Sequence, residues 1–308
     1  MTDLSSRRSF ANGSQFAWDA TSLELAQTCM RKYYYRMILN IAPRAESVHL
    51  LFGGIYASSL EFFYHQRALG LSIDDALRVT IRHAMQASWS VEENTPLTFD
   101  DQNKTRFNLI RSLVWYVDQF GEESSTGITT YHLASGKPAV ELSFTLEFSE
   151  DILYCGHLDR VVEFAGGLYW MDQKTTKTTI TPRYFEQFKP HNQFMGYTWA
   201  GQTILHSPIK GGIVDAAQIA VGFTRFERQP ITFTKDQLEE WRENTMLTIA
   251  RARELTEAGR FPMNLSACGN YGGCPYRILC QRSPSVRDRF IEGHFVHPSE
   301  PWEPIKAR

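Results

Sequence analysis

Residues 139–178 read AVELSFTLEFSEDILYCGHLDRVVEFAGGLYWMDQKTTKT, and this stretch decides the fold. From residue 140 to residue 148 apolar and polar side chains alternate, which is the pattern of a half-buried β-strand. Two further apolar segments, 152–164 and 168–174, flank the short turn Ala165-Gly166-Gly167, which is suited to a β-hairpin. The stretch therefore predicts three strands of one sheet.

Three ionisable side chains lie on the predicted hairpin, namely Asp159, Asp172 and Lys174. Side chains alternate between the faces of a strand, so Asp172 and Lys174 share a face. A hairpin centred on the two glycines places Asp159 opposite Lys174 and one diagonal step from Asp172, within side-chain reach. A lone Asp-x-Lys is usually a solvated strand end with a weak surface ion pair. Two carboxylates and an amine on one face instead favour a divalent metal site with the lysine beside it.

The composition is that of an ordinary globular protein, with 308 residues, 43% hydrophobic residues, 21% charged residues and a net charge of −2. The length allows one large domain or two smaller ones. The charge gives no global attraction to nucleic acid or to a membrane, so a nucleic-acid enzyme of this composition would need a local basic channel. The chain has no run of 18 apolar residues and no signal peptide at its N-terminus, and we therefore expect a cytoplasmic protein.

The hydrophobic pattern predicts helices on both sides of the sheet in the sequence. The expected helices are 22–38 (capped by Ser22), 55–69, 72–88 (capping box Ser72-x-x-Asp75), 105–120, 193–205 and 234–259. The helix at 105–120 is expected to bury Phe107, Ile110, Val114 and Val117. Strand-like sequence at 213–233 is interrupted at 228–230.

These elements predict a single domain at 21–282, with a helical part at about 50–130, a sheet core at about 138–233 and a cysteine loop at 268–280. Residues 1–20 are expected to be poorly ordered, and the tail at 283–308 receives no assigned structure.

The five cysteines are an odd number in a chain without a secretion signal, which argues against a disulfide framework. Cys268, Cys274 and Cys280 follow the spacing C-x5-C-x5-C in a glycine-rich loop, which predicts a metal site. Cys29 is the natural fourth ligand, since Cys155 would be buried in a strand. Structural zinc sites usually contain C-x2–4-C pairs, which are absent here, whereas wide spacings with one remote cysteine suit an iron–sulfur cluster.

The chain resembles the RecB-type nucleases of the PD-(D/E)XK superfamily, specifically the iron–sulfur branch that includes the AddB nuclease domain and the cluster-bearing nucleases of CRISPR adaptation and phages. In that family a Gly-x-x-Asp strand, an Asp-x-Lys strand and a Gln-x-x-x-Tyr helix follow one another. The matching residues here are Gly156 to Asp159, Asp172 to Lys174, and Gln193 to Tyr197. One cysteine near the N-terminus and three near the C-terminus complete the pattern, which spans Cys29 to Cys280.

Two positions depart from the family pattern. The family usually has the helix motif Gly-x-x-x-His-x-x-Leu-Glu, whose histidine is a metal ligand, whereas residues 53–61 here read GGIYASSLE and place Ala57 at the histidine position. Glu61, one helical turn on, could take over part of that role, or the site has fewer protein ligands. The family also commonly has C-x2-C-x5-C, and the first gap between cysteines is longer here.

The resemblance implies an α/β fold of the restriction-endonuclease-like type: a mixed central sheet flanked by helices, with a helical insertion and a [4Fe–4S] cluster joining the N- and C-terminal regions. It implies metal-dependent hydrolysis of DNA, as an exonuclease on single-stranded ends or flaps in DNA repair, recombination, or CRISPR or phage DNA processing. The expected partners are DNA and a helicase, recombinase or CRISPR integrase, with no membrane.

The same resemblance implies roles for individual residues. Asp159, Asp172 and the backbone carbonyl of Gln173 would hold Mg²⁺ or Mn²⁺. Lys174 would orient the attacking water or stabilise the transition state. Gln193 and Tyr197 would position the DNA strand or the lysine, and Glu141 is a further catalytic candidate.

Two alternatives stay open: a catalytically weak DNA-end-binding subunit, favoured by Ala57, and a zinc-stapled scaffold that recruits partners. The intact set of two aspartates and a lysine argues against the first of these. Visible absorbance would separate an iron–sulfur protein from a colourless zinc protein.

Overall fold

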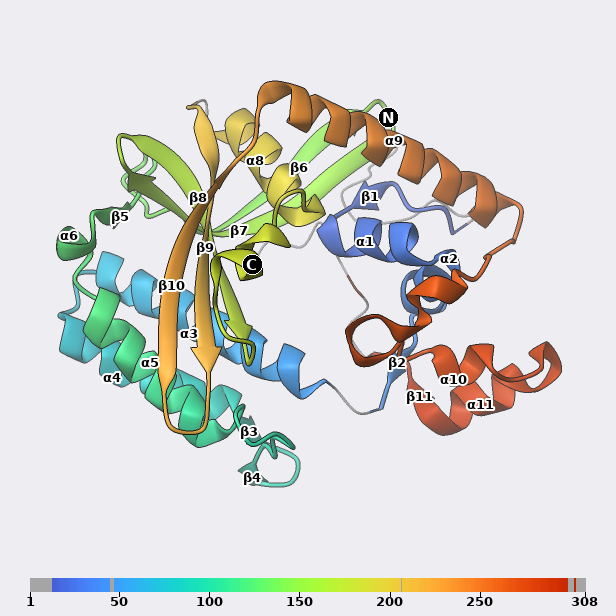
Figure 1. Ribbon diagram of the computed structural model, residues 1–308, viewed down its shortest axis with the longest axis horizontal. Coiled ribbons are helices and arrows are strands. Elements are labelled where there is room, and N and C mark those ends of the chain that lie inside the picture. The colour runs from blue at the N-terminus through green and yellow to red at the C-terminus, as the bar shows by residue number, and fades with distance from the viewer. Residues whose placement is uncertain (1–12, 45–46, 206, 299–301, 303–308) are drawn as a thin grey trace. The chain divides into compact units, whose positions relative to one another are not determined.

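The structure is a computed structural model that describes residues 13–44, 47–205, 207–298 and 302. The chain divides into two compact units, and Figure 1 labels their helices and strands. Unit 1 comprises residues 1–46, 143–156 and 235–307, and unit 2 comprises residues 47–142 and 157–234. Most of the predicted poorly ordered N-terminus, residues 1–12, lies outside the described residues.

The sheet of unit 2 is mixed, as predicted. Its last four strands run in the order β7-β8-β9-β10, in which only the pair β8 and β9 is parallel, and β5 pairs with the other side of β7. The turn between β7 and β8 consists of Ala165 and Gly166, both in the left-handed region with φ of 47° and 69°. The strands are β5 (Ile128–Thr130), β7 (Ile152–Phe164, from His157 on in this unit), β8 (Gly167–Thr176), β9 (Ile209–Ile219) and β10 (Thr224–Thr232).

The interruption in the strand-like sequence at 213–233 lies elsewhere than predicted. β9 and β10 are joined at residues 220–223, and residues 228–230 lie within β10. Pro230 is tolerated there because β10 ends the strand order of the sheet, where one side of the backbone needs no ladder partner.

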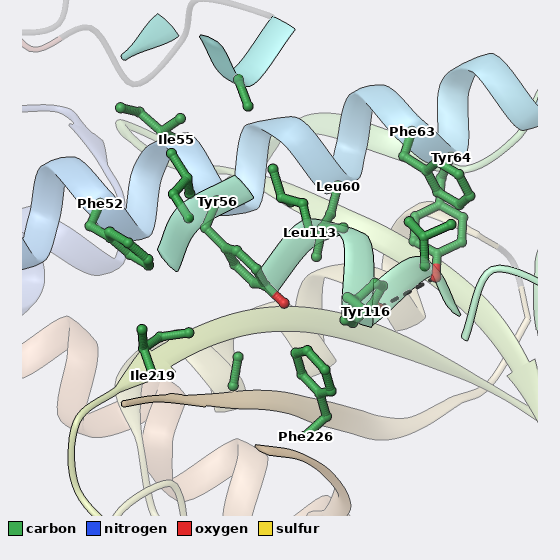
Figure 2. Close-up of a cluster of buried hydrophobic side chains, with 14 of the residues drawn as sticks. Phe52, Ile55, Tyr56, Leu60, Phe63, Tyr64, Leu113, Tyr116, Ile219 and Phe226 are labelled. Atoms are coloured by element: carbon green, nitrogen blue, oxygen red, sulfur yellow. Dashed lines mark hydrogen bonds between the residues drawn. The ribbon is translucent and has the colours of Figure 1, made fainter. Parts of the chain in front are cut away.

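The predicted helical block is confirmed, and its core is shown in Figure 2. Phe52, Tyr56, Leu60 and Phe63 of α3 pack with residues of α5 and of the strands β9 and β10. The helices are α3 (Val48–Ala68), α4 (Ile73–Ala87) and α5 (Arg106–Phe120), and they are followed by α6 (Glu123–Thr126); β3 (Trp89–Ser90) and β4 (Thr95–Pro96) form a small separate pair.

Local signals placed some helix ends correctly and others wrongly. The hydroxyl of Ser72 accepts a hydrogen bond from the backbone N–H of Asp75, so the predicted cap of α4 is confirmed. The predicted start of the preceding helix at residue 55 is wrong, because α3 runs through the two glycines from Val48.

The predicted buried face of α5 is correct for Val117 but wrong for Phe107 and Val114, which are 73% and 38% exposed. The helix buries a neighbouring stripe that contains Leu109, Leu113, Tyr116 and Val117.

Unit 1 joins segments from both ends of the sequence. β1 (Ala17–Trp18) pairs in parallel with Leu153 and Tyr154 of β7. Phe148 and Tyr154 contact the ring of Trp241 on the long helix, α9 (Lys235–Glu257), at ring centroid distances of 5.9 and 5.6 Å. The remaining elements described in unit 1 are α1 (Ala20–Thr28), α2 (Met30–Tyr33), η2 (Tyr34–Ile38), β2 (Ala42–Pro43), η3 (Leu265–Gly272), α10 (Arg277–Cys280), η4 (Pro284–Val286), α11 (Arg287–His294) and β11 (Phe295–Val296); β6 (Val140–Ser149) enters this unit at Ser143.

The first predicted helix, 22–38, is interrupted at Cys29. Asp19 caps α1, with Ser22 at the third helical position completing a capping box, so the predicted cap is three residues too late. Cys29 then adopts an extended backbone, with φ of −169°, and helical structure resumes at Met30.

The tail beyond residue 283, which received no predicted structure, contains α11 and the strand β11, which pairs with β2. Within the described part of the chain, no helix has the length and apolar character that a membrane span requires.

Candidate active site and thiol group

The strand β8 places Asp172 and Lys174 on one face, as predicted. Asp172 is buried, with 2% of its surface exposed, and its Oδ2 lies 2.6 Å from Lys174 Nζ. Asp172 sits in the middle of the sheet, beside Val214 of β9. A buried carboxylate is costly unless a cation or hydrogen bonds compensate it, and the neighbouring ammonium supplies that compensation.

Gln193 joins the two charged groups. Its Nε2 donates a hydrogen bond to Asp172 Oδ1 at 2.9 Å, and its Oε1 accepts one from Lys174 Nζ at 3.2 Å. A side-chain amide has both donors and an acceptor, so one glutamine can satisfy a carboxylate and an ammonium at once. The residue comes from the first turn of α8 (Asn192–Ile204), which follows the short helix α7 (Pro182–Glu186).

Packing against Trp170 fixes α8 over this face of β8. Trp170 Nε1 donates a hydrogen bond to Thr198 Oγ1 at 2.9 Å, and the Trp170 ring lies 4.7 Å from that of Phe194. The indole fills the space that a side chain at Gly212 of β9 would need. The Tyr197 ring meets the same indole edge-on at 6.0 Å, so the predicted Gln-x-x-x-Tyr pair lies on the helix that faces the Asp-x-Lys strand.

Asp159 lies one strand away, in a register that differs from the predicted one. The β7–β8 ladder pairs Phe164 with Gly167 and Arg160 with Met171, because the two-residue turn precedes Gly167. The next step of the same register brings Asp159 level with Asp172, whereas the sequence analysis placed it opposite Lys174. Directly opposed residues share a face, so the corrected register still puts both aspartates on the face that carries Lys174.

The donor set on this face fits a hard divalent cation. Asp172 Oδ2 lies 2.6 Å from Lys174 Nζ, as an ion pair without an aligned hydrogen bond. Carboxylate oxygens are the ligands that Mg²⁺ and Mn²⁺ prefer. Among the described residues, no three His, Cys, Asp or Glu side chains are already arranged around a metal position. The carboxylates are thus suitable ligands, although the structure does not show a complete coordination sphere.

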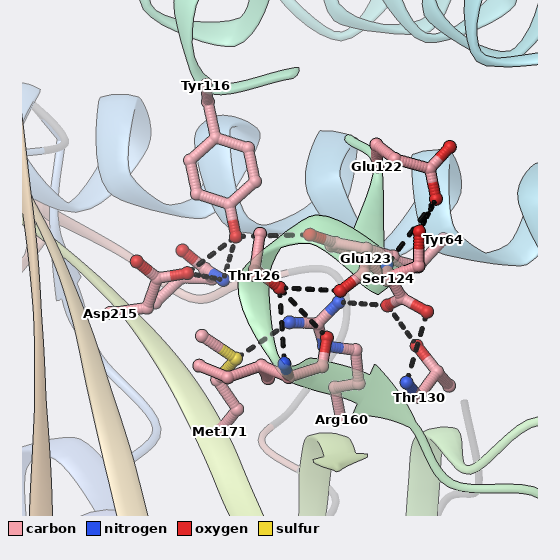
Figure 3. Close-up of polar contacts among 12 residues, drawn as sticks. Tyr64, Tyr116, Glu122, Glu123, Ser124, Thr126, Thr130, Arg160, Met171 and Asp215 are labelled. Carbon is pink, nitrogen blue, oxygen red and sulfur yellow. Dashed lines mark hydrogen bonds and ion pairs between the residues drawn. The ribbon is translucent and has the colours of Figure 1, made fainter. Parts of the chain in front are cut away.

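Gln173, between Asp172 and Lys174, is anchored on the opposite face of β8 by Asp215, whose contact with Tyr116 is shown in Figure 3. Gln173 Nε2 donates to Oδ2 of the buried Asp215 at 3.0 Å, and Tyr116 donates to the same oxygen at 2.5 Å. Arg228 Nε lies 3.3 Å from the other oxygen, Oδ1. Burial, together with the charge of Asp215, raises the pKa of Tyr116 well above its ordinary value, so its hydroxyl remains a donor. Sequence reasoning missed Asp215, although one carboxylate in the apolar run of β9 is a usable signal.

Two aromatic residues near Asp172 were also missed. Burial and, after it, the Asp172 carboxylate raise the pKa of Tyr184 to about 12. Burial and then the charge of Lys174 lower the pKa of His191, which precedes α8, while Asp172 opposes that decrease. His191 Nδ1 is buried without a hydrogen-bond partner. Both residues lie outside the motifs, so no sequence pattern identified them.

Two further predicted site residues, Glu61 and Glu141, lie on α3 and β6. Glu61 is half-buried on α3, the helix that also carries Ala57. Glu141 is half-buried in β6 and has a φ of 51°, a conformation that is uncommon for residues other than glycine. The roles assigned to these two residues stay predictions.

The structure brings Cys29 to the C-terminal cysteine loop through the backbone of Asn264. Cys29 Sγ accepts a hydrogen bond from Asn264 N at 3.3 Å, and Cys268 Sγ lies 3.8 Å from Asn264 O. Cys268 O in turn accepts a hydrogen bond from Cys274 N at 3.0 Å. The interruption of the first helix at Cys29 therefore lies next to the loop.

Cys280 belongs to the same neighbourhood. Cys280 and Cys274 pack against one cluster of apolar side chains. Burial raises the pKa of the Cys280 thiol, Cys274 adds to that increase, and Arg287 and Arg31 oppose it. Cys155 is fully buried in β7, as predicted. The four predicted ligands all belong to unit 1, but the described residues contain no thiol group already arranged to hold a metal.

Comparisons with known proteins identify a nuclease family. The model of the PD-(D/E)XK nuclease superfamily matches residues 17–281. No curated protein matches the chain. The crystal structure of a candidate exonuclease from Eubacterium rectale is similar over 81% of this chain and 83% of that chain, with 12% sequence identity and a TM-score of 0.47.

Proposed function

This chain belongs to the PD-(D/E)XK nuclease superfamily, and from that premise we propose that it hydrolyses DNA phosphodiester bonds at Asp172 and Lys174. The observation that carries the proposal is the Gln193 amide, which joins the carboxylate and the ammonium in one arrangement. The proposed enzyme is an exonuclease acting on single-stranded ends or flaps in DNA repair, recombination, or CRISPR or phage DNA processing.

The metal would be held by oxygen ligands. Asp172, Asp159 and the carbonyl of Gln173 are the proposed ligands, with Glu61 as a further one. When bound, Mg²⁺ or Mn²⁺ lowers the pKa of a coordinated water and neutralises charge on the phosphate. Anchoring of the Gln173 side chain by Asp215 supports this assignment, because it restrains the backbone between the two catalytic side chains.

Lys174 supplies the positive charge next to the reacting phosphate. A preorganised cation stabilises negative charge that develops in the transition state, because it needs no reorganisation during the reaction. Gln193 holds the Lys174 ammonium at a fixed distance from Asp172. The Tyr197 ring, on the same helix as Gln193, packs against Trp170. Glu141 is proposed as a secondary acid–base group. The lowered pKa of His191 keeps that ring neutral near neutral pH, so it does not add a charge that repels a metal ion.

In unit 1 we propose a [4Fe–4S] cluster on Cys29, Cys268, Cys274 and Cys280. The support is the contact of Cys29 and Cys268 with one residue, Asn264, and the electrostatic proximity of Cys280 to Cys29 and Cys274. Residues 21–282 would then form one nuclease domain whose distant ends are joined by the cluster, working with a helicase, recombinase or CRISPR integrase.

Ala57 favours a second candidate, a catalytically weak subunit that binds DNA ends, because alanine cannot ligate a metal where the family has histidine. The two candidates share a DNA substrate and differ in turnover.

The deciding experiment is a nuclease assay on linear and circular DNA with Mg²⁺ or Mn²⁺. Single-stranded and duplex substrates would be labelled at the 5′ or the 3′ end, and a circular single strand would serve as a substrate without ends. We expect cleavage of linear single strands, resistance of the circle, and loss of cleavage in Gln193→Ala. Gln119→Ala, an exposed glutamine of unit 2, is the matched control. Binding without cleavage under every condition would support the end-binding subunit instead.

A further inference from the structure

A lysine outside the proposed active site is almost completely buried. Lys104, in the segment before α5, has 3% of its surface exposed. Its Nζ donates a hydrogen bond to Thr175 Oγ1 at 3.1 Å and lies 5.4 Å from the centre of the Phe52 ring. Both contacts are with neutral groups, so neither supplies a negative charge to balance the ammonium.

The carboxylate closest in sequence is engaged elsewhere. Asp101 forms an ion pair of 2.6 Å with Lys177 Nζ, and its other oxygen accepts the backbone N–H groups of Asn103 and Lys104. Across the described residues, no carboxylate oxygen lies within 4.0 Å of Lys104 Nζ. Burial of a charge without a partner is costly, and lysine is therefore rarely buried in this way.

Burial lowers the pKa of Lys104 from its ordinary value of 10.5 to about 8, although Asp101 opposes that decrease. The amine consequently remains mainly protonated at neutral pH, and it has hydrogens to donate beyond the one that Thr175 accepts.

Two more basic side chains surround this position. Lys177 has 40% of its side chain exposed, and His49 is exposed in the first turn of α3. The pKa of His49 is lowered by burial and then by the nearby charges of Lys104 and Lys177, while Asp101 opposes that decrease. Gly53 lets α3 approach the end of β8, because a Cβ there would lie only 3.3 Å from Thr175 Oγ1. The result is a local excess of positive charge in a protein whose net charge is −2.

The basic group lies on the continuation of the catalytic strand. Thr175 follows Lys174 directly and ends β8 together with Thr176. Lys177 comes three residues after Lys174, about 10 Å further along an extended chain. Thr175 and the Lys104 amine bonded to it lie on the face of β8 opposite Lys174, so a nucleic-acid strand with one phosphate at Lys174 would reach them by passing round the end of β8, where Lys177 follows the strand.

We propose that Lys104 and Lys177, with His49 beside them, form a subsite for a backbone phosphate of the substrate strand. The inference rests on the proposed function, since it assumes a nucleic-acid substrate. A phosphodiester oxygen would accept a hydrogen bond from Lys104 and supply the missing negative charge. Lys177 would contact the same phosphate, either by leaving its ion pair with Asp101 or while keeping it. Lysine is an effective point-charge ligand for phosphate. The subsite would contact the phosphate backbone and no base. It would therefore increase the binding affinity and position the strand without selecting a sequence.

The test is the salt dependence of DNA binding in the absence of cleavage. A fluorescein-labelled single-stranded oligonucleotide would be titrated in EDTA at several salt concentrations, with Lys104→Met and Lys177→Met compared with wild type. Each lost phosphate contact lowers the slope of log K against log salt by about 0.7 for a single strand. We expect a loss of this size in each variant, together with weaker binding. Lys210→Met is the matched control, because Lys210 is an exposed lysine of unit 2 beside Gly167, at the opposite end of β8.

The outcomes separate the two proposals. If wild type binds and cleaves DNA while both variants keep its affinity and salt slope, the subsite is wrong and the proposed function stands. If wild type binds no nucleic acid, both proposals fail. Should Lys104→Met unfold, the exposed Lys177 carries the test alone. A Lys104→Met protein that is folded and binds as wild type, as Lys210→Met is expected to do, would make Lys104 a purely structural residue.

Discussion

The carboxylate site of unit 2 and the thiol group of unit 1 differ in what holds their members together. Asp172, Lys174 and Gln193 contact one another through an ion pair and two hydrogen bonds. Cys29 and Cys268 instead contact the backbone of Asn264. Thiols are weak donors and acceptors, so they cannot fix one another as carboxylates and amines do. The fold therefore builds the first site by itself, whereas the proposed cluster would have to supply the final geometry of the second through its metal–ligand bonds.

The largest effect that would test this difference is expected for Asp172→Ala. The variant removes the central ligand and the partner of both Lys174 and Gln193, so we expect cleavage to fall below detection and Mn²⁺ binding to be lost in calorimetry. Iron content and visible absorbance should not change. The control is Asp236→Ala, in the first turn of α9. Metal-dependent cleavage by Asp172→Ala would remove Asp172 from the site, and loss of iron would show that the two groups are coupled.

Lys174→Ala should reduce the cleavage rate by about 100-fold, the usual cost of one transition-state contact. The side chain is not a metal ligand, so the variant should retain its fold and its affinity for Mn²⁺, measured by calorimetry under the same conditions. This result would separate charge stabilisation from metal binding within the preformed site. A variant that cleaves at the wild-type rate would contradict the assignment of Lys174.

Cys29→Ser tests the thiol group. Because a cluster on Cys29 would join segments more than 200 residues apart, its loss should lower the melting temperature by several degrees and remove iron and visible absorbance, measured after purification without oxygen. Asp172 and its neighbours should still bind Mn²⁺. Cys155→Ser, at a buried cysteine that is not a proposed ligand, is the control for packing effects. Full iron content in Cys29→Ser would exclude Cys29 as a ligand.

The smallest effect is expected for the stability of Lys104→Met. The folded protein holds the pKa of Lys104 near 8, below its ordinary value of 10.5, so protonated Lys104 destabilises the folded state below pH 8. The cost disappears as pH rises from 8 towards 10.5, where the folded protein releases the proton first. Asp101, Lys177, His49 and Thr175 surround the amine, and Asp101 is the carboxylate that opposes the decrease.

Lys104→Met should accordingly melt about 2–4 °C higher than wild type at pH 7, the equivalent of about 1 kcal/mol, and the gain should shrink by pH 10. Differential scanning fluorimetry across this range, with Lys210→Met alongside, measures it. A variant that is less stable than wild type at pH 7 would show that preformed contacts of unit 2 already balance the ammonium.

The sequence predicted which side chains of the candidate site lie together better than it predicted the register of the strands that carry them. Asp172, Lys174 and Gln193 come from short motifs whose spacing sets their faces, and the structure joins them as expected. The predicted partner of Asp159 was wrong by two residues along β8, Lys174 instead of Asp172, because a turn of three small residues permits more than one pairing. Asp215 stands out as a carboxylate in an apolar strand, but its partner could not be predicted, since Tyr116 is 99 residues away.

The helix predictions failed where two local solutions compete. Asp19 and Ser22 are both good caps, and the structure uses the earlier one. α5 carries apolar residues on more than one face, so tertiary partners such as Asp215 decide which face is buried. No pattern in the sequence predicted the interruption at Cys29, because the contact that accompanies it is with Asn264, 235 residues further along the chain.

Trp170 and Gly212 have a consequence for how this chain can change during evolution. The indole ring occupies the volume that any side chain at position 212 would need, and it lies two residues before Asp172 on the same face of β8. A larger residue at 212 would push the ring, and with it α8, away from the catalytic strand. The two positions are therefore expected to covary among descendants of this sequence, with glycine retained wherever the tryptophan is.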